Sequence, residues 1–214
     1  MKIVQLATLP DRDCLPTIKS LIPQVDEVRV ALNGHKEIPR SLNLPKVNAF
    51  LRNNEKGDAE KFYNLPEGYI FTCDDDLVYP QNYIDTFLKA FDEYGDYILT
   101  FHGRDYPPKP IQSYYGDRVK AYRCLHDLEE DSYVDVGGSG VMAWNTSFFK
   151  VDYDKITTKN MGDIWISKFA YEQNVKIICL AHNYGWIKYI APKTTIWDTD
   201  HNNDSIQTSL YNSY

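Results

Sequence analysis

The chain has 214 residues, which is enough for one large domain with a sizeable core and too few for two such domains. Hydrophobic residues make up 43% of it and charged residues 25%, an ordinary globular composition that excludes extensive disorder. The formal net charge of −7 excludes a general nucleic-acid binder, because such proteins hold phosphates mainly with clustered Lys and Arg. We expect a single domain over residues 1–214.

The cysteines and the hydropathy pattern indicate where the protein resides. Cys14, Cys73, Cys124 and Cys179 are widely spread without a C-x-x-C pair, which predicts reduced thiols rather than a zinc knuckle or a disulfide framework. The N-terminus has no signal-peptide core, and no segment approaches the roughly 20 apolar residues of a membrane span. We expect a cytoplasmic protein; contact with the inner face of the cell membrane stays open.

The first half of the chain alternates strand-like and helix-like segments. Expected strands cover 3–9, 28–32, 47–50, 69–73 and 97–101, and expected helices cover 13–21, 58–63 and 83–94. Asp11 or Asp13 suits the cap of the first helix, and Gly95 ends the last one. The alternation predicts an α/β fold with a mainly parallel sheet flanked by helices, whose ligands gather at the carboxyl ends of the strands.

The second half changes character. It contains a proline- and tyrosine-rich stretch, an extended segment, a glycine-rich bend, a helix and a strand, at 105–115, 119–124, 136–141, 161–171 and 176–180. The tail is polar and predicts a turn or a flexible lid. We divide the domain into a first half at 1–103, a second half at 104–198 and a polar tail or lid at 199–214.

Three consecutive aspartates, Asp74, Asp75 and Asp76, follow the expected buried strand at 69–73. Adjacent carboxylates repel one another, so a cation, most simply a divalent metal, is expected to offset the repulsion. Mn²⁺ or Mg²⁺ held here would stabilise the diphosphate that leaves a sugar nucleotide. Because side chains alternate along an extended segment, we assign Asp76 to the metal and Asp74 to the ribose or a metal-bound water. Taken alone, such a run is more often a solvated loop or a helix cap.

Several segments in matching order resemble one known family. They are QLATLPDR, LIPQVDEVRVALNG, GDAEKFY, GYIFTCDDDLVYPQNYI, GSGVMAWN and NMGDIW, and together they cover most of residues 3–190. The chain is similar to bacterial capsule and surface-polysaccharide glycosyltransferases of GT-A fold, in particular the heparosan-type N-acetylglucosaminyltransferases. The resemblance implies a UDP-sugar donor, for example UDP-N-acetylglucosamine, and a glycan or oligosaccharide acceptor. A polysaccharide-assembly complex and a homo-oligomer stay open.

The resemblance also implies donor contacts in the first half. They come from Thr8, Pro10 and Arg12 at the end of the first strand, Asn33 after the second, and Asp58 and Lys61 in GDAEKFY, beside Asp74, Asp75 and Asp76. The residue chemistry agrees in kind, since an aspartate accepts from a uracil N3–H and a lysine neutralises phosphate. The alternative is that Asp58 caps a helix and Lys61 is a solvated charge.

The glycine-rich bend at 137–140 lacks the lysine and the spacing of a phosphate-binding loop. As in the matching segment of the family, Gly138 and Ser139 are expected to let the backbone approach the donor or acceptor sugar. The alternative is a tight turn that needs glycine dihedrals.

Inverting sugar transfer requires a base that removes a proton from the acceptor hydroxyl. Asp163 in NMGDIW is the candidate, because Gly162 leaves room for a sugar and the helix start presents the carboxylate. The family places its base at a corresponding carboxylate. The alternative is a helix N-terminal acid favoured by the macrodipole.

GT-A enzymes often add a later histidine to the metal, and the resemblance offers His182 after the last expected strand and His201 in the tail. A lone histidine is otherwise usually structural. Trp144 and Trp165 flank the expected acceptor side and are candidates for stacking on a sugar face.

These observations favour a metal-dependent inverting glycosyltransferase with a bacterial surface or capsular glycan as acceptor. A sugar-phosphate nucleotidyltransferase is the first rival, but residues 7–12 lack the glycine-rich triphosphate loop that such an enzyme needs. A non-catalytic glycan-binding subunit of the same fold is the second rival. The intact carboxylates at Asp76 and Asp163 argue against it.

Overall fold

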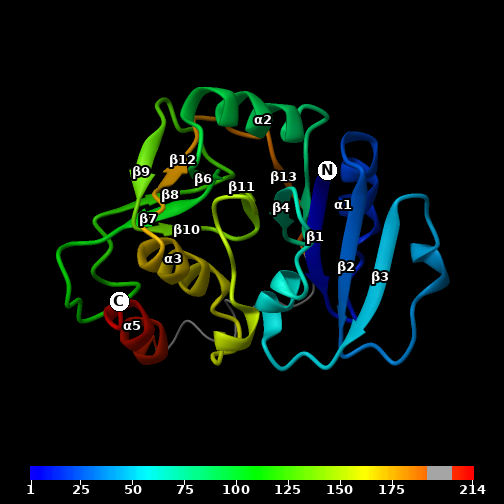
Figure 1. Ribbon diagram of the computed structural model, residues 1–214, viewed down its shortest axis with the longest axis horizontal. Helices are drawn as coiled ribbons and strands as arrows, with labels where there is room; N and C mark the ends of the chain where they lie inside the picture. The colour runs from blue at the N-terminus through cyan, green and yellow to red at the C-terminus, as the bar shows by residue number, and fades with distance from the viewer. Residues whose placement is uncertain (192–203) are drawn as a thin grey trace.

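The computed structural model describes residues 1–191 and 204–214 (Figure 1). Its strands are β1 (Lys2–Thr8), β2 (Glu27–Asn33), β3 (Val47–Arg52), β4 (Tyr69–Cys73), β5 (Leu77–Val78), β6 (Ile98–Thr100), β7 (Gly103–Asp105), β8 (Lys120–Tyr122), β9 (Ser132–Val134), β10 (Val136–Gly137), β11 (Val141–Asn145), β12 (Ile177–Cys179) and β13 (Lys188–Tyr189). Its α-helices are α1 (Leu15–Leu21), α2 (Tyr83–Tyr94), α3 (Gly162–Glu172) and α5 (Ser205–Asn212), and its 3₁₀ helices are η1 (Ile22–Gln24), η2 (Arg40–Leu42), η3 (Gly57–Phe62) and η4 (Tyr153–Lys155).

The protein is an α/β fold built on a mixed, mostly parallel sheet with the strand order β3-β2-β1-β4-β11-β6-β12-β9. The first four strands are parallel, but β11 runs antiparallel to both of its neighbours. The expected parallel sheet is therefore correct in outline, and the reversed strand at its centre is a departure. The chain enters β11 from β10, which belongs to a separate three-stranded sheet with β7 and β8, and β11 then inserts between β4 and β6.

The strand order places a topological switch point between β1 and β4. The chain moves outward from β1 to β2 and β3, then returns to add β4 on the other side of β1. The connections after β1 and β4 consequently diverge, which opens a crevice at the carboxyl ends of these two strands. Thr8 ends β1 and Asp74 follows β4, so both lie at this crevice.

Each face of the sheet has its own core. Along β1, Val4 and Leu6 pack with α1 and α2, whereas Ile3 packs with η3 and α3, as expected from the alternation of side chains along a strand. Trp144 and Trp165 are buried in the second core, at 0% and 7% exposure. Their expected role in stacking on a sugar is therefore not supported, because their rings are used in packing.

The described part of the tail is a helix rather than a turn or a flexible lid. Helix α5 lies beside α3 (Figure 1), and its Tyr211 is buried against Tyr106 with the ring centroids 4.5 Å apart. Asn212 exchanges two hydrogen bonds of 2.9 Å with the backbone of Ile111. Packing of this kind stabilises a short helix that its polar sequence does not predict. His201 lies outside the described residues.

Two further expectations concern the cysteines and the membrane. All four cysteines are free, as expected. Within residues 1–191 and 204–214, no helix is both long and apolar enough to cross a bilayer.

Candidate functional site

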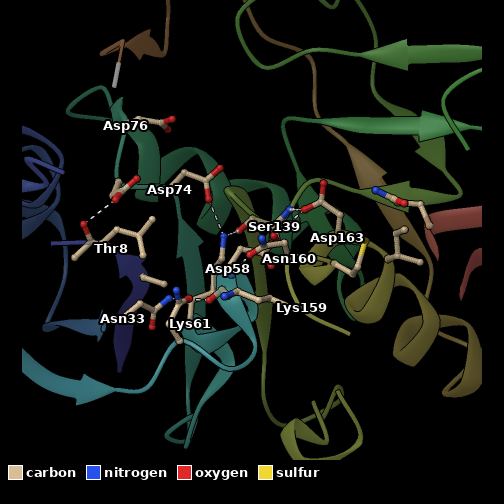
Figure 2. A pocket seen from close by; sticks show the side chains of 18 of the residues that line it. Thr8, Asn33, Asp58, Lys61, Asp74, Asp76, Ser139, Lys159, Asn160 and Asp163 are labelled. Carbon is tan, nitrogen blue, oxygen red and sulfur yellow. Dashed lines mark hydrogen bonds and ion pairs between the residues drawn. The ribbon is translucent and has the colours of Figure 1, made fainter. Parts of the chain in front are cut away.

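A cavity of about 520 Å³ lies at the carboxyl ends of β1, β2 and β4, where the switch point opens the sheet. The start of α3 and the loop before β11 close its other side (Figure 2). The sequence-predicted residues that line it are Thr8, Arg12, Asn33, Asp58, Lys61, Asp74, Asp75, Asp76, Ser139 and Asp163. Pro10 is exposed outside the lining, and Gly138 packs against the ring of His102 instead.

Asp75 joins the aspartate run to the end of β1. Its carboxylate accepts hydrogen bonds from Thr8 Oγ1 at 2.7 Å and from Arg12 Nη1 at 2.9 Å, and the residue is 7% exposed. Burial raises its pKa although Thr8 and Arg12 act in the opposite direction. Asp75 therefore anchors the turn to the end of β1.

Asp74 is paired with a buried lysine. Lys61 Nζ lies 2.7 Å from Asp74 Oδ1, and Lys61 is 2% exposed. Burial disfavours its charge, but Asp74 and Asp58 outweigh burial and raise the pKa of Lys61. Lys61 is thus not the solvated charge that the sequence allowed. The absent Cβ of Gly140 leaves room for the carboxylate, since a Cβ there would clash with Asp74 Oδ2.

Asp76 has the least compensated charge of the three aspartates. Among the described residues its one ion pair is with Arg12 Nη1, at 3.5 Å. Burial, followed by repulsion from Asp74 and Asp75, raises the pKa of Asp76 to about 7. Part of the positive charge expected to offset the repulsion comes from the chain itself, because Arg12 pairs with Asp75 and Lys61 pairs with Asp74. Asp76 is therefore the aspartate whose negative charge is least balanced by cationic groups of the protein.

Asp58 caps a helix that is distant in sequence. Both of its carboxylate oxygens lie 3.2 Å from the backbone nitrogen of Gly162, the first residue of α3. Burial raises the pKa of Asp58 to about 7, with Lys61 opposing and Asp163 adding to the shift. A Cβ on Gly162 would lie 2.6 Å from Asp58 Oδ2, so the glycine permits this close approach.

Asp163, in the first turn of α3, is held on both oxygens. Oδ1 accepts hydrogen bonds of 2.7 Å from the backbone nitrogen and the hydroxyl of Ser139, and Oδ2 lies 3.3 Å from Arg104 Nη1. Burial would raise its pKa, but Arg104 and Ser139 more than offset burial and lower it. Asp163 therefore remains ionised and is a weaker base than Asp58.

Two predicted polar residues occupy different surroundings. Asn33 is 3% exposed, and its Nδ2 donates to the carbonyl of Gly57 at 2.8 Å, whereas its Oδ1 has no hydrogen-bond partner among the described residues. His182 lies outside the cavity, with its ring nitrogens 2.7 and 3.2 Å from the carbonyl oxygens of Leu180 and Arg123. It follows β12, which is three strands from β4 in the order of the sheet.

Sequence reasoning missed several residues that line the cavity. They are Arg104 on β7, Lys159 and Asn160 before α3, and Gln207 on α5. Tyr114 and Tyr115, which the sequence offered among the aromatic residues able to stack on a sugar, also line the cavity. No local motif marks the missed residues. The available signal for a further site residue was Arg104, a basic residue directly after the expected boundary at 103, in a chain whose predicted site is mostly acidic.

The donor set fits a metal that is completed by a ligand. In the described part of the chain, no group of three or more His, Cys, Asp or Glu side chains is arranged to hold a metal ion. Mg²⁺ is commonly bound through one or two carboxylates, with substrate phosphates and water completing the shell. Asp76 and Asp74 at the cavity wall fit that smaller share.

Known proteins add no assignment to this geometry. No protein-family model matches the chain, and a search of the curated proteins gives no match. The fold and the cavity carry the functional interpretation.

Proposed function

We propose that the protein is a metal-dependent glycosyltransferase of GT-A fold that transfers a sugar from a UDP-sugar, for example UDP-N-acetylglucosamine, to a bacterial surface or capsular glycan. The observation that carries the proposal is the position of Asp76, whose negative charge is only weakly balanced by cationic groups. It lies in a cavity at the switch point of the sheet, where open α/β sheets commonly bind nucleotides. Such a site suits a ligand that brings both a nucleoside and phosphates. A cytoplasmic location near the membrane that exports the glycan belongs to the same proposal.

The nucleoside end is supported by Asn33. Its buried Oδ1 lacks a hydrogen-bond partner among the described residues, and an amide oxygen accepts from an N–H such as that of uracil N3. An acceptor left without a partner in a buried place costs free energy, so a ligand N–H there would recover it. Thr8 and Asp58 also line the cavity.

The phosphate end is supported by the charges of the cavity. Among the described residues, five carboxylates and four basic side chains line it, and a diphosphate would add further negative charge. Asp76 and Asp74 are the residues proposed to hold Mn²⁺ or Mg²⁺. When bound, the ion supplies stabilisation of the negative charge on the leaving diphosphate. Arg12 and Lys61 pair with the neighbouring carboxylates of Asp75 and Asp74 and hold them in place.

Two carboxylates compete for the role of the base that an inverting transfer requires. Asp163 faces the cavity and is permanently ionised, but it is held by Ser139 and Arg104. Asp58 has a pKa near 7, which suits a general base at neutral pH, but it caps α3. Inversion with Asp163 as base is the reaction proposed. The anomeric configuration of the product, read by NMR, tests this choice, because an inverted configuration requires such a base and a retained one does not call for it.

A thermal-shift screen of nucleotide sugars with and without Mn²⁺ tests the proposal, because a ligand that binds the folded state raises its stability by mass action. A UDP-sugar should raise the unfolding midpoint in the presence of Mn²⁺ and lose this effect when a chelator is added. Incubation of that donor with oligosaccharide primers should then release UDP. Pyrophosphate released from UTP and a sugar phosphate would instead identify a nucleotidyltransferase. Saccharide binding without any nucleotide binding would identify a glycan-binding subunit.

A further inference from the structure

The C-terminal helix contributes a buried polar side chain to the cavity. Gln207, on the first turn of α5, lines the cavity and is 3% exposed. Its Oε1 has no hydrogen-bond partner among the described residues. A buried amide oxygen without a partner is unfavourable in the folded state, and it is a ready acceptor for an O–H or N–H of a ligand.

The local sequence offers this side chain a partner that it does not take. Asp204-Ser205-Ile206-Gln207 has the spacing of a capping box, in which the side chain of the fourth residue bonds the backbone N–H of the first. In the structure Gln207 Oε1 leaves that bond unmade, and Asp204 makes no side-chain cap. The Asp204 carboxylate instead accepts from the Tyr115 backbone nitrogen at 2.8 Å and the Ser113 hydroxyl at 2.7 Å.

The docking of α5 fixes where Gln207 points. Thr208 Oγ1 accepts a hydrogen bond of 2.9 Å from the Tyr114 backbone nitrogen, and the Tyr114 hydroxyl lies 3.2 Å from Arg104 Nη1. Arg104 in turn pairs with Asp163. This chain of contacts puts Gln207 at the Asp163 end of the cavity. In Figure 2, α5 (red) passes beyond Asp163, while Thr8 and Asp76 lie on the opposite side.

We propose that Gln207 is a specificity-determining residue that accepts a hydrogen bond from a hydroxyl or amide N–H of the acceptor saccharide. The inference rests on the proposed function, because it divides the cavity into a nucleotide end at Asn33 and Asp76 and a saccharide end at Asp163 and Gln207. A saccharide is the ligand class that matches, since its ring carries several donors and Tyr115, which also lines the cavity, offers an aromatic face. Helix α5 thereby forms part of the binding wall.

The test is saturation-transfer NMR with methyl glycosides of glucose, galactose, N-acetylglucosamine and glucuronic acid, in the presence and absence of UDP and Mn²⁺. At least one glycoside should bind the wild-type protein. Gln207→Met keeps the length of the side chain but removes the acceptor, and it should weaken this binding about 3- to 10-fold, the value of one hydrogen bond. Ser209→Ala, at an exposed position of the same helix, is the matched control and should bind as the wild type does.

If Gln207→Met does not fold, Gln207→Asn replaces it, because the shorter side chain withdraws the oxygen by one methylene. Equal affinity of the folded variant and the wild type would overturn the inference, as would failure of the wild-type protein to bind any of the four glycosides. Calorimetry of UDP with Mn²⁺ on the same variants is scored separately. In the wild-type protein, sugar binding without nucleotide binding contradicts the donor proposal alone, whereas nucleotide binding without sugar binding contradicts only the role of Gln207.

Discussion

The two ends of the cavity hold carboxylates in opposite electrostatic states. Asp76 has one ion pair at 3.5 Å among the described residues and a pKa raised to about 7. Asp163 accepts two hydrogen bonds from Ser139, pairs with Arg104 and has a lowered pKa. The two side chains are similarly half-buried, with 22% and 30% of their surface exposed, so the difference comes from their partners rather than from burial.

This contrast shows which end of the cavity is complete by itself. At the Asp163 end the protein supplies every charge and hydrogen bond that the carboxylate needs. At the Asp76 end two neighbouring carboxylates add repulsion, and the protein supplies part of one guanidinium. A cation from outside the chain would therefore gain more at Asp76 than at Asp163.

Removing the charge of Asp163 is expected to have the largest effect. Asp163→Asn should lower the rate of sugar transfer about 10²- to 10⁴-fold, the range for loss of a general base, while UDP binding stays nearly unchanged. Asp58→Asn is the companion variant, measured over pH 5.5 to 9. Preserved turnover in Asp163→Asn would contradict its assignment as the base. If the transfer rate changes with pH near 7 in the wild type but not in Asp58→Asn, the role of the base passes to Asp58.

Asp76→Asn should remove the carboxylate that is proposed to bind the cation at the other end of the cavity. We expect the Mn²⁺-dependent affinity for UDP to fall at least about 30-fold, because the metal loses its least compensated ligand. Calorimetry with and without Mn²⁺ measures this, with Asp85→Asn on the exposed face of α2 as a control. Metal-independent transfer by the wild type, or undiminished Mn²⁺ affinity in the variant, contradicts the role given to Asp76.

Gly140→Ala should disturb the same end by crowding alone. The added methyl clashes with Asp74 Oδ2, so the carboxylate has to leave Lys61 while every charge is kept. We expect the donor affinity to fall about 5-fold or more, the lower end of the cost of overpacking. Circular dichroism checks that the fold is intact. Wild-type donor affinity in a folded variant would show that the position of Asp74 is unimportant.

The smallest expected effect is on the pH dependence of the stability of the folded protein. Because the pKa values of Asp58 and Asp76 are raised from 3.8 to about 7 in the folded state, folded protein binds extra protons between these values. The associated stability is fully present below pH 4 and is lost as the pH rises through 7. In metal-free buffer the unfolding midpoint should fall by about 2–5 °C between pH 5.5 and 8, and Asp76→Asn should reduce this fall. A midpoint that rises over this interval contradicts the raised pKa values.

The sequence by itself determined the elements of the first half. Periodicity and flanking residues gave β4 and α2 with their correct bounds, and Gly95 ends α2 at φ 77°, where glycine is unstrained. The aspartate run was identified from its place after an expected buried strand, whereas Asn33, Asp58 and Lys61 were identified through the resemblance to a known family; all of them line the cavity. The strands, the helix and the aspartate run are local features or follow from a regular alternation, so they can be read without a structure.

The tertiary structure decided what these residues do. Pairing of Arg12 and Lys61 with the aspartates joins residues 63 and 13 positions apart, and the capping of α3 by Asp58 spans 104 positions. The reversed strand β11, the exclusion of His182 and the entry of Gln207 into the cavity also depend on contacts between distant segments. The charge state of a carboxylate depends on its burial and its partners in space, and these distances are fixed only when the chain folds.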